Sequence, residues 1–417
     1  MKHSLPNKNE RFLYLEPYTF SVMAGNDVLI YNSLNGRILE YRDSPAVARF
    51  ISEAEDPGGG FLAAMDTEPG NPEIASLVAD LRESFCGDLV SASGKLRPSV
   101  IRPKPVIKNY PPDKDSPSFS ADDYLRNIYF FLNQDNNEVC TDYRFAANQF
   151  FCPVFNQQGY SEMQFETVFN TCSRYTGVSG MEISLSGSDI TAYSEIKNVI
   201  SRIHKLLLPV TFHLPLPCSD PDVVSRLLRI PKSRTSLYIS FPGGPKALKA
   251  IRRNPEYIKK QHLVDLNFMI RSLDEYKAVT ELLQEPGKEK VFLFPYFDGG
   301  NSGFFKENVF LSKDEILSLK PTQKQIYSRS LINEQLYGKI FILTGGEVCA
   351  NMNTGPIGNI NTHSMEELVR HEIAGGQCWE MTRMKVTPCS ECLYRLFCPP
   401  VGNYELFMKK FNFCDVL

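Results

Sequence analysis

The sequence predicts an α/β protein built on a parallel sheet, with a small sheet-and-helix domain before it and a cysteine-rich segment after it. Strand-like and helix-like apolar runs alternate from about residue 125 to 297, which is typical of βα units. At 417 residues the chain is also longer than one hydrophobic core usually organises. Finally, four of the 11 cysteines fall between residues 389 and 414, which predicts a separate, metal-stapled unit.

Residues 1–100 are predicted to form the first domain. Short β-type runs broken at Gly25-Asn26 and Asn35-Gly36 come first, and two amphipathic patterns behind possible N-caps follow. A glycine- and proline-bearing loop, Pro57–Gly70, separates the two helical patterns. The strands are expected at Phe12–Leu15, Tyr18–Met23 and Val28–Tyr31, and the helices at Pro45–Glu55 and Pro72–Phe85. The proline-rich residues 101–117 are predicted to be a linker.

Residues 118–297 contain six consecutive βα-type units. With right-handed crossovers, such units form an open barrel or a doubly wound layer, and ligands bind at the carboxyl ends of the strands. The strands are expected at Asn127–Leu132, Met181–Leu185, Val210–Leu216, Ser236–Phe241, Leu263–Ile270 and Lys290–Pro295. The helices are expected at Ser194–Leu208, Pro221–Ile230, Pro245–Lys260 and Leu273–Gln284.

Residues 298–417 are loop-rich, with one strand expected at Lys339–Leu343 and one helix at Ser364–Ile373. Such a segment needs a staple to be ordered. A C-x2-C turn followed by two further cysteines offers four thiolates for zinc or for a [4Fe-4S] cluster, and the spacing does not choose between them. The ligands would be Cys389, Cys392, Cys398 and Cys414; four unligated buried thiols are the alternative.

The charge balance is nearly neutral, with 45 basic and 48 acidic residues. It disfavours binding to nucleic acid or to an anionic membrane surface. The polar start, Met1–Arg11, has no apolar signal region, and the apolar stretches elsewhere are too short to span a bilayer. We therefore expect a cytoplasmic protein, in whose reducing surroundings clustered cysteines indicate metal binding.

The loop after the first expected barrel strand resembles that of radical SAM enzymes. These enzymes have a partial (βα)6 barrel whose CxxxCxxC loop holds a [4Fe-4S] cluster that binds S-adenosylmethionine. On that pattern the three ligand positions are Asn136, Cys140 and Tyr143, so only one thiolate remains. The stretch that holds the methionyl amine in the family corresponds here to Ser186–Asp189, which has also lost its motif. The resemblance implies a retained fold without a SAM-binding cluster, because Asn and Tyr cannot replace thiolates on iron.

The C-terminal block resembles the SPASM extension of peptide-modifying radical SAM enzymes, in which C-x2-C-x5-C and a later cysteine hold an auxiliary cluster. The amino-acid sequence of Pro388–Pro400, with Asn403-Tyr404-Glu405 after it, resembles that of pseudo-radical-SAM/SPASM proteins of Bacteroidales GG-type ribosomal peptide (RiPP) systems. One [4Fe-4S] cluster is implied, with zinc as the alternative. A second cluster is not, because Gly402 stands at one of its ligand positions. The implied partners are a precursor peptide and an active radical SAM maturase.

The N-terminal domain resembles the winged-helix-like RiPP recognition element in its order of strands before helices. In that module a leader peptide adds as a strand at an exposed sheet edge beside a helix. The residues expected to bind the peptide here are Val28, Leu29, Ile30 and Tyr31 of the edge strand and Leu77 and Leu81 of the helix. A plain packing domain is the alternative.

These features predict a catalytically degenerate accessory protein without catalytic residues. The histidines are scattered, with no spacing typical of a metal or acid–base site. Two alternatives remain open. One is an enzyme that reuses the barrel mouth through Cys140, Cys152 or Asp189, and the other is a structural subunit whose only ligand is the C-terminal metal. Neighbouring genes for an intact CxxxCxxC protein and a short Gly-Gly precursor would favour the first prediction.

Overall fold

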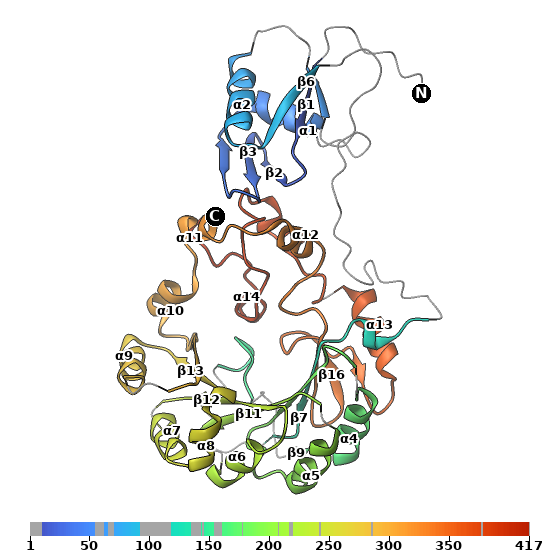
Figure 1. Ribbon diagram of the computed structural model, residues 1–417, viewed down its shortest axis with the longest axis vertical. Coiled ribbons are helices and arrows are strands. Elements are labelled where there is room, and N and C mark those ends of the chain that lie inside the picture. Colours follow the sequence, from blue (N-terminus) through green and yellow to red (C-terminus); the bar gives the residue numbers. More distant parts are fainter. Residues whose placement is uncertain are drawn as a thin grey trace.

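A nine-stranded, mostly parallel sheet forms the centre of the computed structural model, and helices cover one of its faces (Figure 1). The structure describes residues 11–54, 62–65, 71–91, 118–134, 143, 146–153, 161–176, 178–206, 208–216, 220–241, 243–284, 287–376 and 378–416. The predicted linker, residues 101–117, lies outside this range, as do Asn136 and Cys140. Within the described part, no helix is long and apolar enough to cross a membrane.

Six parallel strands follow one another across the sheet in chain order, and a seventh, from the C-terminal segment, pairs in parallel with the first of them. Two short antiparallel strands extend that side. The order is β14-β13-β12-β11-β10-β7-β15-β16-β17. The bounds are β7 Asn127–Phe131, β10 Glu182–Ser186, β11 Val210–Leu216, β12 Ser233–Ile239, β13 Val264–Ile270, β14 Lys290–Pro295, β15 Lys339–Ile342, β16 Glu347–Cys349 and β17 Gly358–Asn359.

All six strands expected in residues 118–297 are present, with β11 and β14 at the expected bounds and β12 starting earlier, at Ser233. The predicted helix Pro245–Lys260 is two helices, because the residue before Pro255 is kept out of the α conformation and Asn254 caps the second helix. The connecting helices are α4 Phe165–Arg174, α5 Ile196–Leu206, α6 Pro221–Leu227, α7 Gly244–Arg252, α8 Pro255–Lys260 and α9 Leu273–Leu282.

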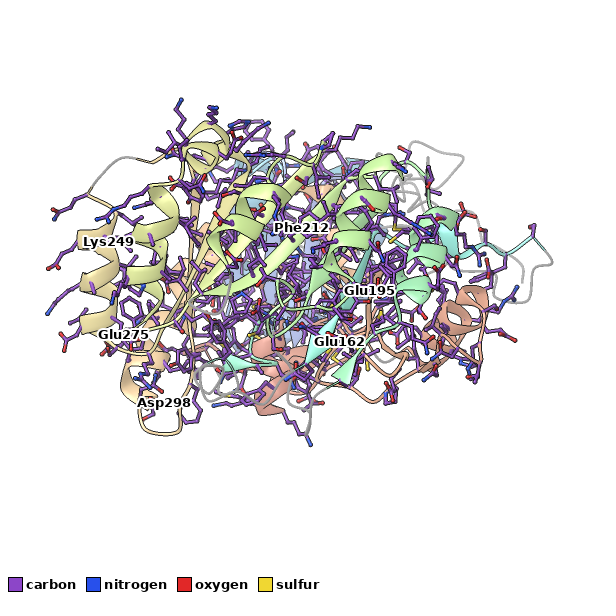
Figure 2. All side chains as sticks on the ribbon, turned by 90° about the horizontal axis from the view of Figure 1, so that it is seen from below. Glu162, Glu195, Phe212, Lys249, Glu275 and Asp298 are labelled. Carbon is purple, nitrogen blue, oxygen red and sulfur yellow. The ribbon has the colours of Figure 1, made fainter. Side chains whose placement is uncertain are left out.

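The strand order has no reversal among these six strands, so it lacks the switch point of a doubly wound layer. Alternate residues of each strand face the helices and form the main core, as Ile128 and Phe130 do on β7. Figure 2 shows Phe212 of β11 in the middle of the helix-covered layer, whereas Lys249 and Glu275 lie at its rim. Residues of the opposite parity line the inner face.

Short elements complete this region. Strands β8 Asn133–Gln134 and β9 Ser161–Glu162 pair beyond the carboxyl end of β7. Two 3-10 turns, η1 Ala121–Asp123 and η3 Gln261–Leu263, precede β7 and β13.

The N-terminal domain has two three-stranded antiparallel sheets, β5-β1-β6 and β2-β3-β4. Two of the three expected strands are longer than predicted and one is shifted by a residue, and three further strands are present, two of which follow helices. The bounds are β1 Arg11–Leu15, β2 Thr19–Ala24, β3 Asp27–Asn32, β4 Ile38–Tyr41, α1 Pro45–Ala54, β5 Leu62–Met65, α2 Pro72–Glu83 and β6 Gly87–Ser91. The predicted loop Pro57–Gly70 thus contains a strand, and the order of strands and helices differs from the expected one.

The expectation that Val28–Tyr31 form a sheet edge is wrong. These residues lie in β3, which pairs with β2 on one side and with β4 on the other, so both rows of backbone groups are used. Their side chains are buried, as are Leu77 and Leu81 of α2. The peptide-binding site predicted from these six residues is therefore closed to strand addition, because Ile38–Tyr41 adopts a strand that the sequence pattern did not indicate.

The C-terminal segment returns to the sheet and then forms a block over its inner face. Helix α14 lies between the N-terminal domain and that face (Figure 1). The expected strand and helix are present as β15 and α13, and further helices surround them. The bounds are α10 Ser302–Val309, α11 Lys313–Ser318, α12 Gln323–Leu331, α13 Met365–Gly375, η4 Cys389–Glu391 and α14 Asn403–Met408.

The sheet β2-β3-β4 packs against the cysteine block. Phe20 and Tyr31 share a buried cluster with Leu393 and Phe397, which lie between two of the cysteines. The Tyr31 ring contacts Phe397 edge-on at 4.7 Å, and its hydroxyl donates to the carbonyl of Pro321. The N-terminal domain therefore shares part of its core with the segment expected to bind metal.

Candidate functional site

The carboxyl ends of the central strands are closed by a buried tyrosine. Tyr143 stands at the third cluster-ligand position of the family pattern and is fully buried. Its hydroxyl proton is shared between the main-chain carbonyl oxygens of Leu216, at the end of β11, and of Tyr238 in β12, the latter at 2.8 Å. A phenol thus bridges two strands at the point where ligands of such sheets usually lie.

Aromatic side chains fill the space around this tyrosine. Phe150 stacks on Phe294 of β14 at 4.8 Å, and Phe151 lies against Tyr129 and His213 at 4.7 and 4.6 Å. The His213 imidazole is buried among these rings, and burial lowers its pKa to about 3. Its Nδ1 lies 3.3 Å from the Tyr238 hydroxyl, and its Nε2 has no hydrogen-bond partner among the described residues. We conclude that the imidazole is neutral and part of an aromatic core.

The loop after β10 is held against the end of β7. Asn133 accepts a hydrogen bond from Ser188 N and donates to the carbonyl oxygen of Asp189 at 2.6 Å. A Cβ at Gly187 would lie 2.3 Å from the Asn133 amide oxygen, so only glycine fits this approach. The side chain of Asn133 therefore packs against Gly187 and Asp189, within the stretch that the resemblance to radical SAM enzymes assigned to the methionyl amine.

If the chain were an enzyme that reuses the barrel mouth, Cys140, Cys152 or Asp189 would be its reactive groups, and the structure describes the last two of these. Burial raises the pKa of the Asp189 carboxyl, but its oxygen accepts hydrogen bonds from the backbone and the hydroxyl of Thr191 and so stabilises a turn. The Cys152 thiol is buried and lies 3.7 Å from the Tyr143 carbonyl oxygen. Cys140 lies outside the described residues.

The four C-terminal cysteines lie in one block. Cys389 and Cys392 sit on a 3-10 turn, in which Cys392 N donates to Cys389 O at 3.0 Å. Cys414 is held by a bridge between its strand-like segment and Leu311. Cys398 is near enough to the other three for their charges to affect its pKa. The four residues that the sequence singled out therefore lie in one region of the structure, and their binding of a metal stays a prediction.

The polar surroundings of these thiols suit thiolate ligands. The Tyr394 N–H donates to the Cys392 sulfur at 3.4 Å, and the Arg383 guanidinium donates to the Cys389 sulfur at 3.5 Å. Arg383 is also held by the Glu405 carboxylate in a bidentate ion pair that is almost completely buried. Burial raises the pKa of the Cys398 thiol to about 12, so a bound cation would have to stabilise its deprotonated form.

The donor set, four thiols with N–H groups directed at two of the sulfurs, fits a thiophilic metal or cluster. In the described part of the chain, however, no three Cys, His, Asp or Glu side chains converge closely enough to hold one ion. The Cys389 thiol donates instead to the carbonyl oxygen of Phe411 at 3.0 Å. Binding would therefore have to draw the thiols together.

A cavity of about 480 Å³ lies between the cysteine block and the aromatic residues at the carboxyl ends of the strands, which we call the aromatic mouth (Tyr129, Phe150, Phe151 and Phe294). Its walls include Phe150 and Phe294 from the aromatic mouth and Cys389, Cys398 and Cys414 from the block. Sequence reasoning missed two charged residues of this lining, Arg383 and Glu405, which form a buried ion pair beside the cysteines. Glu405 was named only as part of the sequence after Pro400 and Arg383 not at all, although a charged pair flanking a cysteine cluster could have suggested a supporting role.

No family model matches the sequence, and no curated protein matches it. Among solved structures, the chain is similar to Streptococcus suis SuiB, with a TM-score of 0.48 and 11% identity over 96% of this chain and 97% of that chain. SuiB bound to S-adenosylmethionine gives a TM-score of 0.42 at 9% identity, covering 96% and 97%. SuiB bound to its precursor peptide SuiA gives 0.43 at 10% identity, covering 96% and 98%. TM-scores below 0.5 at such identities establish neither a shared family nor a shared function.

Proposed function

We propose that this chain is a catalytically degenerate radical-SAM-like protein that binds a ribosomal precursor peptide and assists its modification by an active radical SAM partner. The observation that carries the proposal is the environment of Tyr143. Where the family pattern requires a cluster thiolate, a fully buried phenol is bonded to two strand carbonyls. A side chain committed to the core in this way is not available to bind iron.

The surrounding structure supports the same conclusion. Six parallel strands in chain order with helices on one face fit a partial (βα)6 barrel. Phe150, Phe151 and His213 fill its mouth, and Asn133 fills the approach to Gly187. The scaffold of a radical SAM enzyme is then retained for binding and positioning rather than for cleavage of S-adenosylmethionine.

The C-terminal block is proposed to be a SPASM-like unit with one metal centre. Cys389, Cys392, Cys398 and Cys414 would hold a [4Fe-4S] cluster, with zinc as the alternative. A closed, four-thiolate site stabilises the fold of its block and provides no open coordination position for chemistry. Arg383 would orient the Cys389 sulfur through the contact already present.

The decisive experiment is anaerobic reconstitution with iron and sulfide, followed by S-adenosylmethionine and a strong reductant. We expect no 5′-deoxyadenosine above a no-protein control, while an intact CxxxCxxC protein encoded beside this gene, treated identically, produces it. Production by the chain itself would overturn the proposal. In a second arm, the full chain is added to that partner and the neighbouring precursor peptide. Faster peptide modification supports the accessory role, and an unchanged rate contradicts it.

A further inference from the structure

Strand β14 ends the nine-stranded sheet and exposes three consecutive apolar residues. In the described structure it pairs only with β13. Val291, Phe292 and Leu293 are 38%, 45% and 39% exposed, whereas the middle strands of the sheet are buried. Consecutive residues of a strand point to opposite faces, so apolar surface is exposed on both faces of the same edge. Proteins usually cover or blunt such an edge, because it is a template for another strand.

Along part of β14, the backbone N–H and C=O groups on the side away from β13 have no strand to pair with in the described structure. Tyr296 N donates to Ile270 O of β13, so by the two-residue period the even-numbered residues of β14 bond to β13. The N–H and C=O groups of Val291 and Leu293 therefore point away from the sheet. The open stretch ends at Pro295, which has no N–H and whose carbonyl oxygen accepts from the Tyr404 hydroxyl at 2.6 Å. Figure 2 shows Asp298, just beyond this strand, at the margin of the molecule.

The charges beside the edge define what can pair with it. Lys288 and Lys290 are exposed at the start of β14, and neither forms an ion pair within the described residues. Glu289, between them, is engaged by Arg252 at 3.1 Å and by the Tyr257 hydroxyl at 2.9 Å. Within the described residues, two lysines without an ion pair thus lie at the amino-terminal end of the apolar residues. Lysines also discourage two copies of an edge from pairing with each other, and they favour a strand that carries carboxylates.

We propose that β14 is the docking edge for an extended, acidic and apolar peptide segment, which adds to the sheet as a tenth strand. Hydrogen bonds at Val291 and Leu293 would supply affinity, the apolar side chains would select alternate residues of the peptide, and the lysines would select a carboxylate near one end. The inference rests on the proposed function and names the site where the precursor binds. Strand addition then takes place on the large sheet and not at β3, which is already paired on both sides.

The test uses the full chain and a synthetic, acetylated peptide of about ten residues, with alternating valine and threonine and two glutamates at one end. Fluorescence anisotropy measures binding to the wild type and to two variants at one position. L293P removes an outward N–H that β13 does not use, so the native ladder is kept. L293T keeps the N–H and removes only the apolar side chain. Thermal unfolding confirms that both variants remain folded.

We expect micromolar binding to the wild type, a loss of about tenfold or more in L293P and a loss of about threefold in L293T. K290E should also weaken binding, and by a larger factor at low salt than at high salt, because salt screens the attraction between the lysine and the peptide carboxylates. Equal affinity for L293P and wild type overturns the proposal. So does unchanged binding of both of two peptides, one N-methylated at the odd and one at the even residues, since one of the two must lose the N–H groups that face β14. A concentration-dependent dimer that L293P abolishes and that the peptide does not displace also overturns it, because the occupant would then be a second copy.

The neighbouring precursor peptide separates this inference from the proposed function. If the synthetic peptide binds through the edge but the precursor does not bind at all, the edge exists and the precursor-binding role is wrong. If the precursor binds the wild type and L293P equally, the function stands and the β14 site is wrong. Binding of both peptides, each weakened in L293P, supports both.

Discussion

The carboxyl-end mouth of the parallel sheet, around Tyr143, and the C-terminal cysteine block differ in what their side chains offer: aromatic rings in the first and thiols in the second. At the mouth, Tyr143 bonds to two strand carbonyls and aromatic rings fill the space. In the block, four thiols lie in one region, and Arg383 and the Tyr394 N–H are directed at two of the sulfurs. One region is thus filled by aromatic packing, whereas the other contains side chains of a kind that can bind metal.

The two regions differ in how much apolar surface they can bury without a bound metal. The mouth belongs to a sheet with a large core, so apolar rings added there gain burial and close-packed contacts. The block has short helices and turns, and part of its apolar surface is covered by the N-terminal domain. Such a unit depends on cross-links for its order. We therefore expect the block to be sensitive to the loss of its ligands, and the mouth to be sensitive to the loss of its hydrogen bonds.

The largest effect is expected from the double variant C389S/C392S, which removes half of the proposed thiolate set. Metal content should fall to background, and the block should become susceptible to proteolysis, because binding energy at such sites is folding energy, on the order of 10 kcal/mol for closed zinc sites. Elemental analysis and limited proteolysis measure the two effects. Undiminished metal in this variant would place the ligands elsewhere.

The matched control for that variant is C349S, which changes a buried cysteine packed among the aromatic rings of β7 and β15. The lone Cys349 is not expected to hold a second cluster, so the metal content per chain should stay as in the wild type. A decrease in C349S comparable to that in the double variant would mean that the two regions share a metal centre and would remove the contrast between them.

The second effect concerns the buried ion pair that supports the block. The side chains of Arg383 and Glu405 are only 11% and 6% exposed, so R383A leaves a carboxylate without its partner. We expect the free energy of unfolding to decrease by about 3–5 kcal/mol. Chemical denaturation measures it, with R82A as the control, because the Arg82–Asp88 pair is exposed and should contribute about 0–1 kcal/mol. Equal effects of the two substitutions would show that burial of the pair is unimportant.

The parallel strands could be predicted because each is a short apolar run between turn signals, and their pairing follows from chain order. The bounds of β11 and β14 match the predicted runs. Pairing between distant segments could not be predicted in this way. β15 lies beside β7 although some two hundred residues separate them, and Ile38–Tyr41 becomes β4 only because β3 offers it an edge. That unrecognised strand is why the predicted peptide site at β3 is closed.

The cysteine part of the candidate site could be predicted, because the spacing of its residues in the sequence identifies it. The cysteines stand at fixed intervals near the end of the chain, so their grouping was visible in the sequence. The aromatic mouth was not. Tyr129, Phe151 and His213 come from three different elements, and no local pattern brings them together. Only Tyr143 was singled out, and its hydrogen bonds depend on where two other strands end.

The third effect is a pH dependence that originates in the mouth. His213 has a pKa of about 3 in the folded protein, well below its ordinary value of 6.5, because it is buried. As the pH falls below 6.5, the unfolded chain takes up a proton that the folded chain does not, so stability decreases by about 1.4 kcal/mol per pH unit until the folded imidazole titrates. H213F should flatten the decrease between pH 6.5 and 4.5, and thermal unfolding at several pH values measures it.

The control for this dependence is H262F, which replaces an exposed imidazole on the 3-10 turn before β13. Its acid-side slope should equal that of the wild type. If H213F retains the full slope, carboxylates elsewhere account for the acid sensitivity, and the mouth does not hold a neutral imidazole.

The smallest effect, and the one that tests the mouth most directly, is Y143F. The substitution keeps the ring and its packing but removes the hydroxyl that donates to Leu216 O and Tyr238 O. Because these acceptors lie in a buried site, we expect a loss of about 1–3 kcal/mol in the free energy of unfolding without any change in metal content. Y276F, at a position that is 42% exposed on α9, should change stability by less than about 0.5 kcal/mol. If the free energy of unfolding of Y143F equals that of the wild type, the Tyr143 hydroxyl does not contribute to stability and only the packing of the ring does. A lower metal content would mean that the mouth and the cysteine block depend on each other for metal binding.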